Sequence, residues 1–364
     1  MIKIVKPTLL LNEAICKANI LRMADKARKA NVKFRPHFKT HQSLAVGEWY
    51  GELGVDCCTV SSIKMATYFA EGGWKDITIA FPLNTLEIDA INKLASICKL
   101  NVLIVSPETI KQLKGKLKQP VNCFIEIDPG YKRTGLLPTD HAGIDRILAE
   151  ISSDPLLTFK GFLAHAGHSY QSRTREAIMK IHNDSILLMK VLGDHYRKQY
   201  PQLVLSTGDT PTCSLATDFT GVDEIRPGNS VFYDLQQTEI GSCTKDQVAI
   251  AMGCPVVAMN EERGEIFVHG GGVHFAKDAM KKEDGTMYYG EIVKLNDSGW
   301  ELPSTTMFMK SLSQEHGVVK ASKEEMKSIR IGDVLGVLPV HACLTADAMG
   351  AYTTLQGQEI QMMK

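Results

Sequence analysis

Short apolar runs rich in β-branched residues alternate with amphipathic stretches between about residue 10 and residue 235. Eight of these runs are typical of strands, and they contain the segments VKFRPHFKT, VDCCTVSS, ITIAF, NVLIVS, NCFIEID, GFLAHAG, VLSTGD and DEIRP. Between most of them apolar residues recur at helical spacing. The longest such stretch has one apolar face formed by Ile178, Ile181, Leu188, Leu192 and Tyr196. The pattern predicts parallel strands connected by helices.

Eight strands alternating with helices allow a (β/α)8 barrel or a doubly wound open sheet. No GxGxxG motif follows the first strand, which weakens the dinucleotide-binding form of the open sheet. Residues with possible chemical roles also fall at or just beyond strand ends, where barrel active sites are built. These residues are Lys39, Arg133, His165, Thr210 and Arg226. We therefore expect an α/β fold with a (β/α)8 TIM-type barrel.

The hydrophobic pattern changes after about residue 240, where the runs become short, apolar and punctuated by turns. The segments NEERGE and NDSGW are typical of hairpin turns. We expect the barrel to occupy residues 8–238, and a C-terminal β-rich domain to occupy residues 239–364 together with residues 1–7. The N-terminal run IKIVKPTLL can join the β domain or lead into the barrel.

Composition narrows the class of protein. Equal numbers of acidic and basic residues give a formal net charge of zero, so the whole molecule has no attraction to nucleic acid or to an anionic membrane. No apolar run approaches the roughly 20 residues that span a bilayer. The nine cysteines are scattered and include no CxxC pair, which is typical of buried thiols in a reducing compartment. We expect a cytoplasmic protein.

Lys39 lies in the unusual segment VKFRPHFKTHQ, which places histidine and basic residues close to it. A lysine at the end of a barrel strand can form a Schiff base if burial or nearby cations lower its pKa. The alternative is a solvated surface charge, which is the role of most lysines.

Two glycine-containing segments follow the seventh and eighth predicted strands. They are STGDTPT, which ends at Thr212, and RPGNS, which begins at Arg226. The loops at these positions of a barrel often bind phosphate, because glycine lets backbone N–H groups approach the anion. Thr210 and Thr212 add hydroxyl donors. Either segment alone can be a tight turn, but both together favour a phosphate site.

The segment LPVHACLTAD contains His341 and Cys343 at positions i and i+2. On an extended segment both side chains point to the same face, and imidazole with thiolate favours zinc. Two ligands leave room for water or substrate. The alternative is a buried cysteine beside a hydrogen-bonded histidine. Glu315 is a candidate partner for such a site, and the segment HGGGVHFAKD adds two further histidines around a possible glycine turn.

The motifs together resemble one enzyme family. RPHFKTH, IEIDPGYKRTG, AHAGHSY, GDTPT, EIRPGNSVFYD, HGGGVHF, LSQEHG and PVHACLT follow one another along nearly the whole chain. In this order they resemble the fold-type III, pyridoxal phosphate-dependent enzymes, in the branch that holds metal-dependent D-serine dehydratase and D-threonine aldolase. The resemblance implies an alanine racemase-like barrel, a homodimer, bound pyridoxal 5'-phosphate and a zinc or manganese ion.

The resemblance also assigns roles to residues. It implies that Lys39 binds the cofactor covalently and later acts as the catalytic base, with Arg133 and Tyr170 beside the cofactor ring. The family's phosphate cradle is matched by Thr210, Gly228 and Asn229. Its metal pair is matched by His341 and Cys343. The implied reaction is β-elimination from a D-3-hydroxy amino acid, such as D-serine or D-3-hydroxyaspartate, to a keto acid and ammonia.

Three other activities fit parts of the same pattern. Aldol cleavage to glycine and an aldehyde needs the same residues, and only the soft thiolate of Cys343 favours elimination over it. An amino-acid racemase of this fold needs a second base and no metal, which the His341–Cys343 pair argues against. A non-catalytic pyridoxal phosphate-binding protein is usually a lone, smaller barrel.

Overall fold

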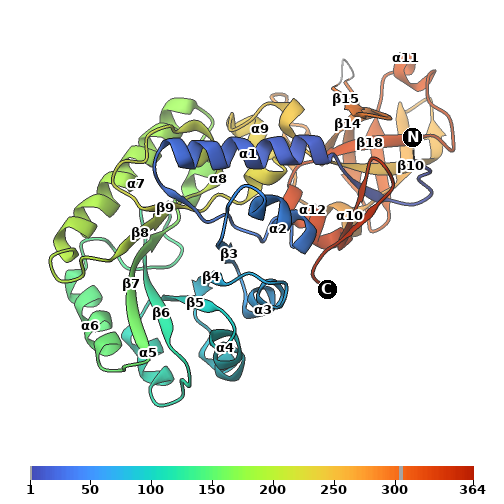
Figure 1. Ribbon diagram of the computed structural model, residues 1–364. Coiled ribbons are helices and arrows are strands. Elements are labelled where there is room, and N and C mark those ends of the chain that lie inside the picture. Colours follow the sequence, from blue (N-terminus) through green and yellow to red (C-terminus); the bar gives the residue numbers. More distant parts are fainter. Residues whose placement is uncertain (1, 303–305) are drawn as a thin grey trace. The chain divides into compact units, whose positions relative to one another are not determined.

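The computed structural model describes residues 2–302 and 306–364 (Figure 1). Met1 and residues 303–305, which fall within the predicted β domain, lie outside the described residues. Contacts divide the chain into two compact units. The barrel unit comprises Leu21–Lys39 and Gly47–Gly228, and the β unit comprises Met1–Ile20, Thr40–Val46 and Asn229–Lys364.

This division differs from the expected boundary, which placed residues 8–238 in the barrel. The strand β1 (Thr8–Leu11) pairs with a strand of the β unit, and residues 229–238 also belong to that unit. The short segment Thr40–Val46, which directly follows Lys39, belongs to it as well. The change in hydrophobic periodicity along the sequence marks where the barrel strands end and the strands of the β unit begin. The boundary between the two compact units depends instead on the contacts of short connecting segments, which periodicity does not reveal.

Eight parallel strands form the sheet of the barrel unit, in the order β2-β9-β8-β7-β6-β5-β4-β3. They are β2 (Lys33–Phe34), β3 (Cys58–Val60), β4 (Asp76–Pro82), β5 (Lys99–Ile104), β6 (Val121–Ile127), β7 (Leu157–Ala164), β8 (Val204–Thr207) and β9 (Glu224–Ile225). The two edges meet, because the Phe38 N–H donates to the Thr59 carbonyl and the Thr59 N–H donates to the Pro36 carbonyl, both at 2.8 Å. The sheet is therefore closed, which confirms the predicted barrel.

The first strand of the barrel is only two residues long. Pro36 has no N–H to donate to a neighbouring strand, so regular pairing ends before it. Arg35 forms buried ion pairs with Glu224 at 2.9 Å and with Asp76 at 2.6 Å. Because Glu224 and Asp76 are the first residues of β9 and β4, the Arg35 side chain lies toward the amino ends of the strands, away from the end that Lys39 follows.

Helices alternate with the strands, and Figure 1 shows α5, α6 and α7 along the outer side of the sheet. The helices after β3 to β8 are α3 (Ile63–Glu71), α4 (Ile88–Ala95), α5 (Pro107–Leu113), α6 (His141–Ser152), α7 (Arg175–Tyr196) and α8 (Thr210–Leu215). The longest, α7, begins after Thr174, whose hydroxyl accepts the Ala177 N–H. It buries Ile178, Leu192 and Tyr196 of the predicted face, so that part of the pattern is confirmed.

The β unit contains a ten-stranded, mostly antiparallel sheet, and β10 pairs with both β11 and β18. The ring β11-β17-β16-β14-β18-β10 is therefore closed around a core that includes Tyr288, Val293 and Leu338. Besides β1, its strands are β10 (Ile250–Asn260), β11 (Glu265–His269), β14 (Gly290–Asn296), β15 (Gly299–Glu301), β16 (Phe308–Leu312), β17 (His316–Lys320), β18 (Val334–Pro339), β19 (Ala351–Thr354) and β20 (Glu359–Gln361). This confirms the predicted C-terminal β-rich region.

Two segments that the pattern placed among strands are helical. The run HGGGVHF contains α10 (Gly272–Phe275), and the run after Val340 contains α12 (Ala342–Met349), which ends before Gly350 in the left-handed conformation. Alanine, leucine and methionine in α12 favour a helix, and glycine favours its end, so this signal was present in the sequence. Among residues 2–302 and 306–364, no helix has the length and apolar character needed to cross a membrane.

Candidate functional site

Five strand ends of the barrel carry residues expected to hold the cofactor. Lys39 follows β2, Arg133 follows β6, Tyr170 follows β7, Thr210 follows β8 and Gly228 follows β9. These strands are parallel, so their carboxyl ends lie at the same end of the barrel. The structure brings the five residues to one end of the fold, and their roles stay predictions.

The Lys39 side chain is exposed, and the backbone around it is fixed. The Lys39 N–H donates to Nδ1 of His37 at 3.3 Å. The His37 N–H in turn donates to the Pro227 carbonyl at 3.1 Å. These two hydrogen bonds hold the turn that carries the lysine, while its amine is open to a ligand.

His165, directly after β7, shows how positive this end of the barrel is. Burial lowers the pKa of His165 to about 3, and the charges of Lys39, Arg226 and Arg133 repel a proton on the ring further. Its Nδ1–H donates to the Gly208 carbonyl at 3.0 Å, so the ring is neutral and Nε2 carries a lone pair. Three cations near one neutral ring fit an anionic ligand.

Tyr170 and Thr210 contact each other directly. The Thr210 N–H, at the start of α8, donates to the Tyr170 hydroxyl at 3.2 Å. The buried carboxylate of Asp209 precedes Thr210 and accepts the Ser169 hydroxyl at 2.6 Å and the Thr212 N–H at 2.9 Å. Burial raises the pKa of Asp209 to about 6, although these hydrogen bonds oppose the rise. The motif GDTPT therefore contains an N-cap, which the sequence reasoning did not assign.

Arg226 and Glu126 line the interior at the same strand ends. Nε of Arg226 donates to the Ser206 hydroxyl at 2.6 Å, and the guanidinium also donates to the Ala164 carbonyl. Oε1 of Glu126 accepts the Thr134 hydroxyl at 2.9 Å. Burial raises the pKa of Glu126, and its Oε2 has no hydrogen-bond partner within the described part of the chain. Oε2 of Glu126 is therefore a buried oxygen that can accept a hydrogen bond from a bound ligand.

Asn229 begins the β unit, and its side chain is held by Asp234. The Asn229 amide donates to Asp234 at 2.6 Å, and the Ala342 N–H donates to the same carboxylate oxygen at 2.9 Å. The other oxygen accepts the Gln237 N–H at 2.9 Å. The fully buried Asp234 thus joins a predicted phosphate-binding residue to the first residue of α12, a role that no spacing in the sequence indicates.

His341 and Cys343 contact each other, although not on the extended segment that we expected. His341 precedes α12 with extended backbone angles, whereas Cys343 lies in the first turn of the helix. The Cys343 sulfur lies 3.3 Å from the Thr40 hydroxyl. Burial disfavours a charge on His341, but hydrogen bonding with Cys343 and the nearby Asp234 and Asp278 raise its pKa to about 9. An imidazole and a sulfur in an electronegative surrounding fit a divalent cation.

Asp278 orients the imidazole of this pair. The His341 Nδ1–H donates to Asp278 at 3.1 Å, which leaves Nε2 as the atom that can bind a metal. We expected Glu315 near this pair, but its carboxylate lies against His269 and His274 instead. Asp278 is 63 residues from His341 in the chain, so sequence spacing does not reveal it.

Two family models match the chain. A parallel barrel with a lysine beyond its first strand, followed by an antiparallel β unit, defines the alanine racemase-like class of folds. The model of the alanine racemase N-terminal domain matches residues 12–236, and the model of a putative serine dehydratase domain matches residues 249–355. The chain belongs to the alanine racemase N-terminal domain family and also contains the second domain, which confirms the resemblance.

Curated relatives of the chain include dehydratases and aldolases. D-serine dehydratase of Dictyostelium discoideum is 27% identical over 95% of this chain and 92% of its own length. D-threo-3-hydroxyaspartate dehydratase of Delftia sp. is 28% identical over 93% of this chain and 90% of its own length. A 3-hydroxy-D-aspartate aldolase of Paracoccus denitrificans is 24% identical over 98% of this chain and 89% of its own length.

A solved structure of the Delftia dehydratase has a TM-score of 0.91 at 25% identity, with 99% of this chain and 98% of that chain covered. A D-threo-3-hydroxyaspartate dehydratase has also been solved as a histidine-to-alanine variant, and as a cysteine-to-alanine variant in a metal-free form. The two substituted positions lie two residues apart in that enzyme, which is also the spacing of His341 and Cys343 here.

Proposed function

We propose that this protein is a lyase that uses pyridoxal 5'-phosphate and a divalent metal ion to convert a D-3-hydroxy amino acid into a keto acid and ammonia. The observation that carries the proposal is the exposed Lys39 amine at the carboxyl ends of the barrel strands, where Arg133 and Arg226 add positive charge. An aldehyde cofactor with a phosphate group needs an amine and a positively charged surrounding.

The barrel residues would hold the cofactor by complementary chemistry. Lys39 Nζ would form the covalent link, and the positive charges of Arg133 and Arg226 would attract the anionic groups. Thr210 and Gly228 would donate hydroxyl and backbone N–H groups to the phosphate, with Asn229 at the next position of the chain. The Tyr170 hydroxyl, which accepts the Thr210 N–H, would fix the Tyr170 ring beside the cofactor.

His341 Nε2 and Cys343 Sγ would hold the metal, which we propose to be zinc and, as an alternative, manganese. The Asp278 carboxylate fixes the His341 ring through Nδ1, as such partners do for metal-binding histidines. In support, a D-threo-3-hydroxyaspartate dehydratase 25% identical to this chain has been solved as a cysteine variant in a metal-free form, and its substituted histidine and cysteine have the same spacing as His341 and Cys343. Two protein ligands leave positions for the substrate.

When bound, the cofactor supplies an electron sink and the metal polarises the 3-hydroxyl of the substrate. Lys39 Nζ, released when the substrate amine displaces it, would take the α-proton. The electron pair of that C–H bond would form the new C=C bond, and hydroxide would leave Cβ with the electrons of the C–O bond. The proton and the hydroxide together make one water, and the later hydrolysis consumes one water again. The enamine that results tautomerises and is hydrolysed to a keto acid and ammonia.

Elimination is favoured over aldol cleavage by the relatives and by one ligand. The D-serine and D-threo-3-hydroxyaspartate dehydratases match at 27% and 28% identity, and the matched domain model over residues 249–355 is of the serine dehydratase type. The sulfur of Cys343 is a soft ligand, which favours zinc.

We extend the proposal to a homodimer, which the resemblance implies and sedimentation equilibrium can test. All nine cysteines are free thiols, which supports a reducing compartment such as the cytoplasm.

The test is product analysis with D-serine, D-threonine and D-threo-3-hydroxyaspartate, each with zinc and after chelation. We expect keto acid and ammonia from at least one D-substrate, and loss of turnover when zinc is removed. L-serine is the matched control, since one base on one face of the cofactor gives a single stereochemical course. Glycine plus an aldehyde would instead identify an aldolase, and activity confined to L-isomers would exclude both.

A further inference from the structure

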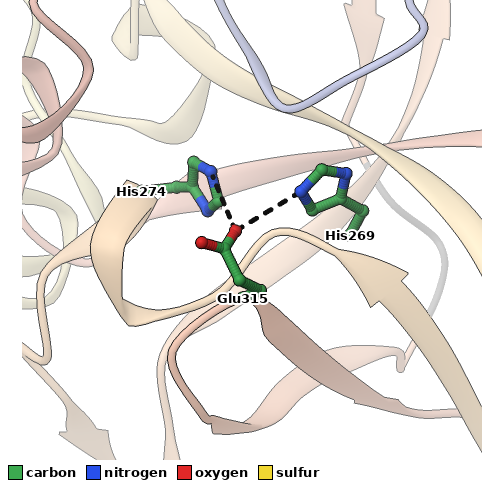
Figure 2. Close-up of side chains that lie close together, drawn as sticks. All are labelled: His269, His274 and Glu315. Atoms are coloured by element: carbon green, nitrogen blue, oxygen red, sulfur yellow. Dashed lines mark ion pairs between the residues drawn. The ribbon is translucent and has the colours of Figure 1, made fainter.

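His269, His274 and Glu315 form a group of side chains in the β unit that the proposed reaction does not use. His269 Nε2 lies 3.4 Å from the Glu315 carboxylate, and His274 Nε2 lies 3.7 Å from the same oxygen. One ligand atom from each residue lies within 4.8 Å of the other two. Figure 2 shows the carboxylate between the two imidazoles, which point toward it from two elements, the strand β11 and the helix α10.

The backbone brings the three residues together from two segments. His269 ends β11, His274 lies in α10, and Glu315 lies in the turn between β16 and β17. The Gly270 N–H donates to the Glu315 carbonyl at 2.9 Å, and the Gly272 N–H donates to the Ser313 carbonyl at 2.7 Å. The two segments are therefore locked side by side before any ligand binds.

The glycines of the HGGGVH run make this close approach possible. A Cβ on Gly271 would lie 2.4 Å from the Gln314 carbonyl oxygen, far inside van der Waals contact. A Cβ on Gly317 would lie 2.6 Å from the Gly270 carbonyl oxygen. Glycine at both positions lets the turn that carries Glu315 pack directly on the segment that carries the histidines.

The donor set is that of a divalent transition-metal site. Two imidazole nitrogens and one carboxylate oxygen are zinc ligands, and a tetrahedral zinc ion with bonds of 2.0–2.1 Å separates its ligands by about 3.3 Å. The separations of 3.4 Å and 3.7 Å from Glu315 are close to that value. The side chains of His269 and Glu315 are 41% and 51% exposed, so solvent can reach the remaining coordination position.

The protonation state of His274 without a metal shows which proton and which hydrogen bond a bound metal ion would change. Its Nδ1 accepts the Gly271 N–H at 3.1 Å, so the neutral ring carries its proton on Nε2, which faces Glu315. A metal ion would replace this proton, and the Gly271 hydrogen bond would then be lost or rearranged. The site without metal is thus a hydrogen-bonded arrangement that a cation can displace.

We infer that His269, His274 and Glu315 form a second divalent-metal site, of the zinc class, separate in sequence and ligand chemistry from His341 and Cys343. The site joins the end of β11, the helix α10 and the β16–β17 turn through one ion. It does not depend on the proposed reaction, since a protein without lyase activity would still bind the ion.

The test measures zinc bound at equilibrium by the full chain carrying His341→Ala and Cys343→Ala, which removes the other pair. We expect one zinc ion per chain in this background. Adding His269→Ala or Glu315→Gln should weaken zinc binding by more than about 100-fold, because loss of a residue that only supports a ligand already costs 10–100-fold. His195→Ala, an exposed histidine of α7, is the matched control and should leave binding unchanged.

Cobalt substitution gives a second, spectroscopic measurement, which begins with the number of ions bound by the wild-type chain. Two cobalt ions per chain should bind, and Cys343→Ala should remove one of them together with the sulfur-to-cobalt charge-transfer band. The remaining ion should show ligand-field bands alone, and Glu315→Gln should remove these. The inference is wrong if the chain without His341 and Cys343 binds no zinc, or if its zinc is unaffected by both His269→Ala and Glu315→Gln.

Discussion

Among single residues, Asp278 determines how His341 can bind a metal. The carboxylate accepts the Nδ1–H, which holds the ring in one orientation and leaves Nε2 as the atom that would bind the proposed metal in place of a proton. The carboxylate is therefore part of the proposed metal site, as a partner of His341 and not as a ligand of the ion.

Asp278→Ala should lower zinc affinity of the His341–Cys343 pair by about 10–100-fold, the usual effect of removing such a partner. Competition with a chromophoric chelator measures this affinity, in a Glu315→Gln background so that one site is read. The control is Asp347→Asn. Asp347 is an acidic residue of α12, and its carboxylate accepts a hydrogen bond from Gln42. Equal affinity in wild type and Asp278→Ala would assign the orientation of His341 to some other group.

Asp209 gives a pH dependence with a defined sign. Burial raises its pKa from the ordinary 3.8 to about 6, so its ionisation opposes folding. This cost is present above about pH 6 and disappears below about pH 3.8, where the carboxyl is protonated in both states. A shift of about two pKa units corresponds to about 3 kcal/mol.

The free energy of unfolding of wild type should therefore rise relative to Asp209→Asn as the pH falls from about 7 to about 4, by up to about 3 kcal/mol. Urea unfolding of the two proteins in parallel at each pH measures the difference and cancels all other titrating groups. A difference that stays constant, or that moves in the opposite direction, would show that Asp209 is ionised at low cost in the folded protein.

At the scale of elements, Asp234 connects three chain segments with one carboxylate. It receives hydrogen bonds from the start of α9 (Leu235–Ile240), from the loop at Asn229 and from the start of α12. Each donor is buried or partly buried, so losing the acceptor leaves it without compensation. The position of α12, which carries the proposed metal ligand Cys343, thus depends through this carboxylate on the position of the proposed phosphate-binding residue Asn229.

Asp234→Ala should destabilise the protein by about 2–4 kcal/mol, because it leaves three donors without their acceptor. Urea unfolding measures this loss, and hydrogen exchange should speed up in residues 229–240 and 342–349 together. The control Asp246→Ala, at an exposed position of the same unit, should cost less than about 0.5 kcal/mol. Faster exchange in only one of the two segments would contradict the connection.

The hydrophobic pattern of the sequence predicted some helices and strands and missed others. The eight barrel strands were predictable, because buried parallel strands leave apolar runs that differ from helical spacing. The helix α12 was missed, because it is short and follows directly on an apolar strand, so the two form one continuous apolar run. As a result, the spacing argument for His341 and Cys343 used the wrong backbone geometry, while the two residues do contact each other.

For the whole molecule, the placement of Lys39, Arg133, Tyr170, Thr210 and Gly228 at one end of the barrel followed from the fold alone. Parallel strands end at the same side, so residues just beyond them meet. The partners Asp234 and Asp278 were not predictable, since they lie 108 and 63 residues from the groups they bind. Their positions depend on the closed sheet of the β unit, which no local pattern specifies.

The division of the chain into units adds one consequence for the whole molecule. Lys39 is the last residue of a barrel segment, and Thr40, whose hydroxyl lies 3.3 Å from the Cys343 sulfur, is the first residue of a β-unit segment. The residue proposed to bind the cofactor and a residue in contact with the proposed metal pair are thus consecutive in the chain.

The central claim is that Lys39 carries pyridoxal phosphate, and covalent mapping tests it most directly. The protein is saturated with the cofactor, reduced with borohydride, digested and analysed by mass spectrometry. We expect one modified lysine, Lys39. We also expect that Lys39→Arg shows neither the modification nor turnover, because a guanidinium stays protonated and cannot form the link. Modification of another lysine, or wild-type turnover by Lys39→Arg, would contradict the account.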